Sequence, residues 1–385
     1  MNKKIYKIFK KIKKNNKLRY LPLHEPFLDK KDKNEIQKCL KSSFVSTAGK
    51  QTILFENKLK KYTKSKYVIC VNSGTSAIHI ALLASSINSN DEVLVPTLTF
   101  VGTVNPILYV GASPHFVDCE KKNLGIDFDK LEDYLKKNTR KRGKYFYNKK
   151  TKKRIRCIIP VHVFGHSVNV DKLKIISKKF NLTIIEDAAE ALGSFFKGKH
   201  LGTLGHFGVL SFNGNKIITT GCGGAILTNN KKLFKIAKHI SNTSKKNHPW
   251  NYLHDKIGFN YRMPALNASL GLSQINKINK ILKYKRRLFK MYKKNFQNLP
   301  EFKVLEEPEN SKSNYWLQTL IIENAQHNKE KYIKFANQQG IQFRPVWNLL
   351  HKLDFLKKYP KMNLSNSSIN EKKILSIPSG NTFRF

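Results

Sequence analysis

The stretch RIRCIIPVHVFGHSVNVDKLKIISKKFNLTIIEDAAEA (154–191) decides the fold class. It opens with a β-branched, apolar run (154–164) and closes with a second one, LTIIEDA (182–188). Between them, VDKLKIISKKF (170–180) places its apolar residues at helical spacing. Strand, helix and strand in this order form a unit whose two strands lie parallel. The stretch therefore predicts an α/β protein with a mostly parallel sheet.

The same alternation extends on both sides of this unit. Further runs with the apolar character of strands buried on both faces are YVICVN (67–72), DEVLVP (91–96), SPHFVDC (113–119), VLSFN (209–213) and GAILTN (224–229). After residue 270 the pattern becomes mixed, with a helix expected at 274–296, a strand at 315–322 and a helix at 329–339. We expect a basic N-terminal arm (1–20), a large domain (21–270) and a smaller C-terminal α+β domain (271–385).

Composition limits the class of protein. The chain has 385 residues, 72 Lys+Arg against 26 Asp+Glu, a formal net charge of +46 and five scattered cysteines without CxxC spacing. The cysteine pattern argues against a disulfide framework and a metal site. The lysines are spread along the chain without a nucleic-acid-binding motif, and no apolar run is long enough to cross a membrane. We expect a cytoplasmic protein with neither nucleic acid nor membrane as partner.

Three peripheral segments carry separate expectations. The first 17 residues are basic, with Ile5, Ile8, Phe9 and Ile12 at helical spacing, which predicts a helix docked on the body. The basic insertion 137–156 is interpreted as an exposed hairpin or loop with a solvated surface. The chain ends at NTFRF (381–385), which we interpret as a truncated C-terminal domain.

Three segments together carry the chemistry. NSGTSA (72–77) lies between a strand and a helix, so Gly74, Thr75 and the helix N-terminus are suited to hold a phosphate, although a simple helix cap explains the same residues. In IIEDAAEA (184–191) an acidic pair ends a buried strand, where open α/β sheets bind ligands. In SFNGNKIITTGCGGA (211–225), Lys216 lies beside a glycine-rich turn.

Each segment has a specific chemical use. A carboxylate at the end of the buried strand can keep a pyridine nitrogen protonated, so that the ring accepts electrons. A partly buried lysine with a lowered pKa can attack an aldehyde and later move a proton between carbons. Ser211 can donate to the phosphate. Taken singly, each residue also fits a structural role, and Lys216 alone would pass for one more surface lysine.

In order and spacing these segments resemble the DegT/StrS family of sugar aminotransferases, from about Leu21 onward. The resemblance extends to DEVLVPTLTF, VGASPHFVDC, GSFFKGKHLGTLGHFG and IGFNYRMPALNASLGLSQI. It implies fold type I, the aspartate-aminotransferase-like fold of pyridoxal-phosphate (PLP) enzymes. It implies Lys216 as the residue that carries PLP as a Schiff base and Asp187 at the pyridine nitrogen. For the phosphate it implies Gly74, Thr75 and Ser211.

Further roles follow from the same resemblance. Glu190 corresponds to a position near the ring hydroxyl, and Phe100 is a candidate to lie against the ring, or else a core aromatic. Asn260 matches an asparagine that reaches the phosphate of the neighbouring subunit, which implies a homodimer with shared active sites. The implied reaction takes an amino group from L-glutamate, with pyridoxamine phosphate as intermediate, and gives it to a nucleotide-linked keto sugar.

A narrower resemblance is to transaminases that make UDP-linked 4-amino-4,6-dideoxy-N-acetyl sugars, on routes to legionaminic acid and bacillosamine. It rests on LPLHEPFLDKKDKNEIQKCLKSSFVSTAGK (21–50), on the insertion and on FRPVWNLLHKL (343–353). This resemblance predicts C4 of a UDP-linked 4-keto-6-deoxy-N-acetylhexosamine as the acceptor, in bacterial surface glycan or nonulosonic acid biosynthesis. Candidate substrate-binding residues, each with a structural role as alternative, are His162, Tyr315, Arg344 and Trp347.

Rival hypotheses remain. The first is a GDP-perosamine-type aminotransferase, and the second is a family dehydratase that removes the C3 hydroxyl. Those dehydratases usually have histidine in place of the lysine, so Lys216 favours transamination. The third, from another class, is a non-catalytic PLP-binding or basic nucleic-acid-binding protein with the same fold.

Overall fold

A computed structural model describes residues 3–323 and 329–381. Its main sheet has the strand order β1-β11-β10-β7-β6-β2-β3. These strands are β1 (Tyr67–Val71), β2 (Asp91–Pro96), β3 (Ser113–Val117), β6 (Arg154–Ile158), β7 (Thr183–Asp187), β10 (Phe207–Ser211) and β11 (Gly224–Thr228). β10, β7, β6, β2 and β3 run parallel, and β11 is antiparallel to both of its neighbours. The α/β prediction is confirmed, and each of the seven strands lies within or overlaps its predicted run.

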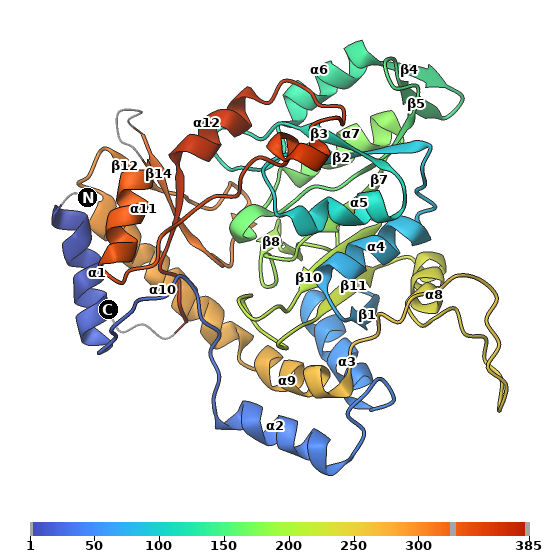
Figure 1. The fold of residues 1–385 in the computed structure, drawn as a ribbon, viewed down its shortest axis with the longest axis horizontal. Coiled ribbons are helices and arrows are strands. Elements are labelled where there is room, and N and C mark those ends of the chain that lie inside the picture. The colour runs from blue at the N-terminus through green and yellow to red at the C-terminus, as the bar shows by residue number, and fades with distance from the viewer. Residues whose placement is uncertain (1–2, 324–328, 382–385) are drawn as a thin grey trace.

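Helices cover this sheet because its strands are apolar on both faces. β2, β7, β10 and β11 are almost entirely buried, so both faces require cover. α4 (Gly74–Ala84) packs on β11, β10 and β7, and α3 (Gln51–Thr63) packs on β1. α7 (Val170–Phe180) packs against α6 (Phe128–Asn138), as Figure 1 shows. α5 (Asn105–Tyr109) packs on β3 and α8 (Lys231–Ile240) on β1, whereas α2 (Lys30–Lys41) packs against α9 (Ala265–Ile275).

A second sheet has the order β12-β14-β16-β15. It contains β12 (Phe302–Val304), β14 (Gln318–Ile322), β15 (Arg344–Pro345) and β16 (Ile374–Ile377), and α11 (Lys329–Gln338) and α12 (Ser365–Lys373) accompany it. A small third sheet joins β13 (Ser311–Lys312) to β8 (Phe195–Phe196), which pairs with β9 (Lys199–His200). β13 therefore links the C-terminal region to a segment that follows β7.

Two hydrophobic clusters meet along one helix. α10 (Ile278–Phe296) contributes Ile278 and Ile281 to the cluster of the main sheet, and Leu288 and Phe296 to the cluster of the second sheet. The segment 346–364 packs against the main-sheet cluster, although it follows the predicted boundary. The boundary near residue 270 stays a prediction.

The helix predicted at 274–296 is two helices in the structure. α9 (Ala265–Ile275) ends just before Lys277, and α10 begins after it. Lys277 is largely buried, and its Nζ lies 2.7 Å from Asp29 and 2.5 Å from Asp32 at the start of α2. These two carboxylates lie about 250 residues away in the chain. The residues around 274–296 therefore contained no sign that the helix is interrupted at Lys277.

The N-terminal helix α1 (Lys3–Asn15) docks on the second sheet's cluster, as its apolar spacing predicted. Phe9 and Ile12 are buried, and the Phe9 ring lies edge-on to Phe343 at 5.0 Å between ring centroids. The side chain of Ile5 and residues 382–385 lie outside the described part of the chain. In the portion that the structure describes, no helix combines the length and apolar character needed to cross a membrane.

Candidate active site

A cavity of about 320 Å³ brings most of the predicted site residues together. Its walls come from the N-terminal end of α4, the carboxyl ends of β7 and β10, and two segments of the C-terminal region. Among the residues that line it are eight predicted ones: Gly74, Thr75, Phe100, Asp187, Glu190, Ser211, Lys216 and Trp347. The carboxyl ends of parallel strands meet at one edge of a sheet, so segments more than 100 residues apart converge there.

One end of the cavity is suited to an anion. Ser73 caps α4, its Oγ accepting the N–H of Ser76 at 3.0 Å, so Gly74 and Thr75 occupy the first turn of the helix. The first N–H groups of a helix have no partners within it, and the helix dipole places positive charge there. Ser211 lies beside Gly74: a Cβ on that glycine would approach Ser211 Cβ to 3.1 Å. The cradle therefore fits a phosphate group.

Gly224 lies directly behind this phosphate cradle. A Cβ on Gly224 would lie 2.5 Å from the carbonyl carbon and oxygen of Ser73 and 2.7 Å from the N of Gly74. Because these are backbone atoms, Gly224→Ala should displace the start of α4. We expect cofactor affinity to fall about tenfold and the protein to lose about 2 kcal/mol of stability.

Cofactor titration by fluorescence and thermal unfolding would measure the two effects. Gly214→Ala is the matched control, since its Cβ would meet only one atom within 4.0 Å. Equal behaviour of the two variants would contradict the predicted role of Gly224.

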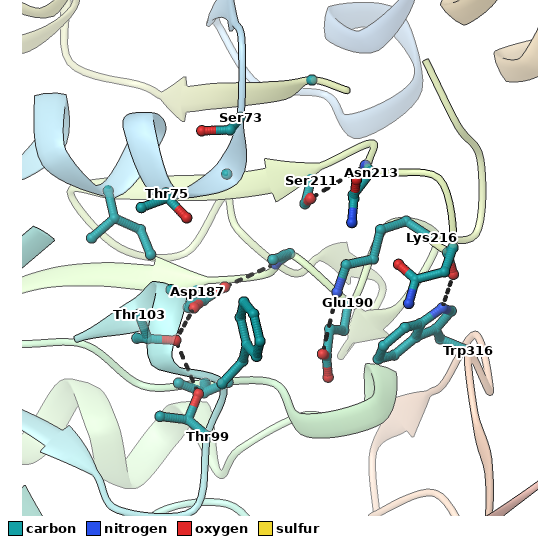
Figure 2. Close-up of a pocket in the computed structure, with 18 of the residues that line it drawn as sticks. Ser73, Thr75, Thr99, Thr103, Asp187, Glu190, Ser211, Asn213, Lys216 and Trp316 are labelled. Carbon is teal, nitrogen blue, oxygen red and sulfur yellow. Dashed lines mark hydrogen bonds and ion pairs between the residues drawn. The ribbon is translucent and has the colours of Figure 1, made fainter. Parts of the chain in front are cut away.

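Asp187 is held rigidly at the last position of β7. Its Oδ2 accepts the Thr103 hydroxyl at 2.7 Å, and its Oδ1 accepts the backbone N–H of Ala189 at 3.1 Å. Thr99 in turn contacts Thr103, with 2.9 Å between their hydroxyl oxygens, as Figure 2 shows. A fixed carboxylate on the wall of the cavity can hold a protonated ring nitrogen, which fits the role predicted for Asp187.

The neighbouring Glu186 faces away from the cavity, because successive strand residues point to opposite faces. It accepts the N–H groups of Gly202, Leu204 and Gly205 at 2.6–3.0 Å, and His162 Nε2 lies 3.1 Å away. The second ring nitrogen of His162 accepts the N–H of Val168 at 3.3 Å. His162 is fully buried with both nitrogens occupied. The structure therefore places His162, predicted to bind substrate, in the core.

The buried Glu186 carboxyl makes the stability of the fold depend on pH. Burial alone would raise its pKa, but the hydrogen bond from His162 and the Gly202 and Gly205 N–H groups hold the pKa below the ordinary 4.5. A lowered folded-state pKa stabilises the fold above pH 4.5, and this stabilisation is lost as the pH falls through the folded-state pKa.

We expect Glu186→Gln to lower the free energy of unfolding by about 3 kcal/mol at neutral pH. As the pH falls, the free energy of unfolding of this variant should decrease less than that of the native protein. Urea unfolding measured from neutral pH to about pH 3.5 tests this. If the free energy of unfolding fell equally with pH in the two proteins, the prediction would be wrong.

Lys216 lies between a carboxylate and an aromatic ring. Its side chain is 14% exposed, its Nζ is 3.3 Å from Glu190 Oε1, and the centroid of the Trp316 ring is 4.0 Å from the same Nζ (Figure 2). The indole N–H of Trp316 donates to the carbonyl of Asn215 at 2.7 Å, which ties the ring to the loop carrying the lysine. The amine thus points into the cavity.

Glu190 is the second buried carboxyl of the cavity. Its Oε2 accepts the N–H of Phe164 at 2.8 Å. Burial raises the pKa of Glu190, opposed by the charge of Lys216 and the Phe164 N–H. It therefore holds a proton more readily than an exposed glutamate and is suited to exchange protons with a neighbouring hydroxyl or amine.

Three other predicted residues lie outside this cavity. Tyr315 has a φ of 51° and stacks on Phe289, with 4.1 Å between ring centroids, so its ring is buried in the second sheet's cluster. Arg344 is exposed on β15. Asn260 is exposed too, and its backbone pairs with Asn242. Trp347 does line the cavity, as predicted.

Trp316 and Thr103 were missed by sequence reasoning. The run YWLQTLII was interpreted as one strand, but β14 begins only at Gln318. The positive φ of Tyr315 turns the chain so that Trp316 faces the cavity. Asn314 fixes this turn, because its Nδ2 donates to the carbonyls of Glu190 and Leu192 at 2.8 and 2.9 Å. In the sequence, only the aromatic pair that precedes the apolar run could have pointed to Trp316.

Comparison with known proteins supplies the family. The DegT/DnrJ/EryC1/StrS aminotransferase family matches residues 26–384. The chain is 35% identical over 345 residues to a GDP-perosamine synthase of Escherichia coli O157:H7, covering 89% of each protein. It is 31% identical to the UDP-4-amino-4,6-dideoxy-N-acetyl-beta-L-altrosamine transaminase of Campylobacter jejuni, covering 91% of this chain and 90% of that protein.

A solved structure gives the same result for the fold. PseC of Helicobacter pylori, described as an aminotransferase involved in the biosynthesis of pseudoaminic acid, superposes with a TM-score of 0.84 at 25% sequence identity. The similarity covers 93% of both chains.

Proposed function

The chain belongs to the DegT/DnrJ/EryC1/StrS aminotransferase family and is a PLP-dependent sugar aminotransferase; from this premise we propose that it aminates C4 of a nucleotide-linked 4-keto-6-deoxy sugar. One observation carries the proposal. Lys216, Asp187 and the N-terminus of α4 line a single cavity, with an amine, a carboxylate and an anion cradle directed at one bound molecule.

PLP, when bound, supplies an aldehyde that accepts the amino group and a ring that stores electrons. Gly74, Thr75 and Ser211 would hold its phosphate, and Asp187 would keep its ring nitrogen protonated. Lys216 would carry the cofactor and would then be the base and acid that removes a proton from the amino donor and delivers one to C4 of the sugar. Glu190, 3.3 Å from the Lys216 amine, would exchange protons with it.

The aromatic side of the cavity is suited to exclude water from these steps. Trp316 covers Lys216, and Trp347, packed at 5.2 Å on the buried Phe164 ring, lines the cavity as well. Such rings also offer flat surfaces to the apolar face of a deoxy sugar. We propose Trp347 as a substrate contact on this basis, with L-glutamate as the amino donor.

Two nucleotides are candidates. The relative with 35% identity is a GDP-perosamine synthase, which favours a GDP-linked sugar. The UDP-linked N-acetyl sugar, expected from the sequence features of residues 21–50 and 343–353, is supported by the 31% identical transaminase. We place the GDP-linked keto sugar first.

The test follows the visible absorption of the PLP-loaded protein. Addition of L-glutamate should bleach the absorption, and addition of the correct keto sugar should restore it. Restoration with the GDP-linked 4-keto-6-deoxy sugar alone would support the first candidate, and restoration with the UDP-linked N-acetyl sugar alone would select the second. If glutamate causes no change, L-glutamate is wrong as the amino donor.

A homodimer with shared active sites is part of the proposal. The loop before Asn260 exposes three large apolar side chains, with Trp250 77%, Tyr252 81% and Ile257 84% accessible. Apolar exposure of this extent favours coverage by another protein surface. Light scattering at micromolar concentration should give the mass of two chains, and Asn260→Ala should weaken cofactor binding while that mass stays unchanged. A monomer with full cofactor affinity would contradict the proposal.

A further inference from the structure

One face of the β4–β5–β6 region gathers arginine and tyrosine side chains. β4 (Thr139–Arg142) and β5 (Tyr145–Asn148) form a hairpin that extends the main sheet from β6. Figure 1 shows this hairpin at the edge of the molecule, beside α6. The basic composition of this segment predicted an exposed hairpin or loop with a solvated surface, and the strand register adds an arrangement of side chains that composition does not show.

The register places six side chains on the same face. Arg140 is opposite Tyr147, Arg142 is opposite Tyr145, and Tyr147 is opposite Arg154. Arg156 follows Arg154 by two residues and so shares its side of the sheet. The Arg/Tyr face therefore consists of Arg140, Arg142, Tyr145, Tyr147, Arg154 and Arg156.

Measured contacts confirm that these side chains lie together. The guanidinium carbons of Arg154 and Arg156 are 5.7 and 5.1 Å from the centroid of the Tyr145 ring, and that of Arg142 is 5.6 Å from the centroid of Tyr147. The opposite face is apolar and packed, with Phe146 at 4.9 Å from Phe180. The polar face is therefore turned outward.

The positive charge of this face is mostly uncompensated. Among the residues that the structure describes, Asp91 is the one carboxylate paired with any of the four arginines, 2.9 Å from Arg154 Nε. Arg140, Arg142 and Tyr147 also line a hollow of about 220 Å³ together with Lys149 and Lys152. A hollow with four cationic side chains and an aromatic wall is complementary to anionic groups that carry flat rings.

We propose that the Arg/Tyr face binds single-stranded nucleic acid. Phosphates would pair with Arg140, Arg142, Lys149 and Lys152, and unpaired bases would stack on Tyr147 and on the guanidinium planes beside Tyr145. Sheets that bind single strands combine a basic track with aromatic platforms in this way. A membrane surface fits less well, because both tyrosine rings are half-buried and in contact with arginines, so neither is free to insert into a lipid layer.

This face is separate from the active site. Arg154 is the first residue of β6, whereas Asp187 is the last residue of β7, and these two strands are parallel. The Arg/Tyr face and the cavity therefore lie at opposite ends of the sheet. Binding at one end leaves the other accessible, so the inference stands independently of which sugar nucleotide is used.

The test is fluorescence anisotropy of the full chain with a labelled single-stranded RNA of about twelve nucleotides, a length within the site sizes of single-strand-binding sheets. Arg140→Gln/Arg142→Gln should weaken binding about tenfold and reduce the slope of log affinity against log salt by about 1.4. Tyr147→Leu should weaken binding about tenfold with an unchanged salt slope, whereas Tyr147→Phe should bind like the native protein.

Lys10→Gln/Lys14→Gln on the exposed side of α1 is the charge-matched control and should change affinity by about twofold at most. All variants should keep the native melting temperature and aminotransferase rate. The proposal would be overturned if the Lys10→Gln/Lys14→Gln control weakened RNA binding as much as the arginine variant. It would also be overturned if Tyr147→Leu left RNA affinity unchanged, or if the protein bound phosphatidylserine vesicles but no RNA.

Discussion

Replacing Lys216 by alanine should abolish amino transfer, with a loss of at least about 10³-fold in turnover. The Lys216 amine is the nucleophile that points into the cavity beside Glu190 and Trp316, and alanine offers no group that can attach the cofactor or move a proton. Lys216→Arg should lose as much, because a guanidinium keeps the charge but is neither a nucleophile nor a base at neutral pH.

The measurement is product formation from L-glutamate and the keto sugar, together with a cofactor titration. The anion cradle is untouched in Lys216→Ala, so PLP should still bind. After reduction with borohydride, denaturation should release all PLP from the variant, whereas the native protein should keep it as a secondary amine on Lys216. Lys61→Ala, an exposed lysine on α3, is the control and should keep the native rate. Undiminished turnover of Lys216→Ala would refute the assigned role.

Replacing Asp187 by asparagine should reduce turnover about a hundredfold or more. The carboxylate is held by Thr103 and by the Ala189 N–H, so its negative charge is fixed at the cavity wall. Asparagine has the same shape but cannot balance the positive charge of a protonated ring nitrogen. The loss should therefore appear in kcat for both half-reactions rather than in the KM of either substrate.

Single-turnover kinetics with L-glutamate would isolate the first half-reaction. Thr103→Val keeps the carboxylate and removes one hydrogen bond to it, so a loss of about tenfold is expected there. Comparing the rate losses of the two variants separates the effect of the Asp187 charge from the effect of its position. If Asp187→Asn reacted with glutamate at the native rate, another group would have to fill the role assigned to Asp187.

Parts of the site that depend on local pattern could be predicted from sequence. A strand that ends in Asp187, a helix that begins at Gly74 and a glycine-rich turn beside Lys216 are each encoded within about ten residues, and the rules for strand ends and helix starts apply to them directly. Ser211 lies in the segment of Lys216, whereas Phe100 was a candidate only through the family resemblance. All of them line the cavity.

Substrate candidates were less successful because their prediction needed side-chain direction. His162 lies in an apolar run close to the site in sequence, but its ring is bonded to Glu186 and Val168 in the core. Tyr315 was chosen over its neighbour, yet a left-handed backbone at that residue turns Trp316 toward Lys216. Arg344 lies on an edge strand outside the cavity.

The sequence by itself determined where the strands and helices of the α/β sheet lie along the chain, the family and the positions of the lysine, the acidic pair and the phosphate cradle. These depend on periodicity and on short motifs. Only the tertiary structure showed that Glu186 is bonded to His162 in the core, that Trp316 covers Lys216, and that four arginines and two tyrosines share one face. Each of these depends on strand register and on packing partners far away in the chain, which local sequence does not encode.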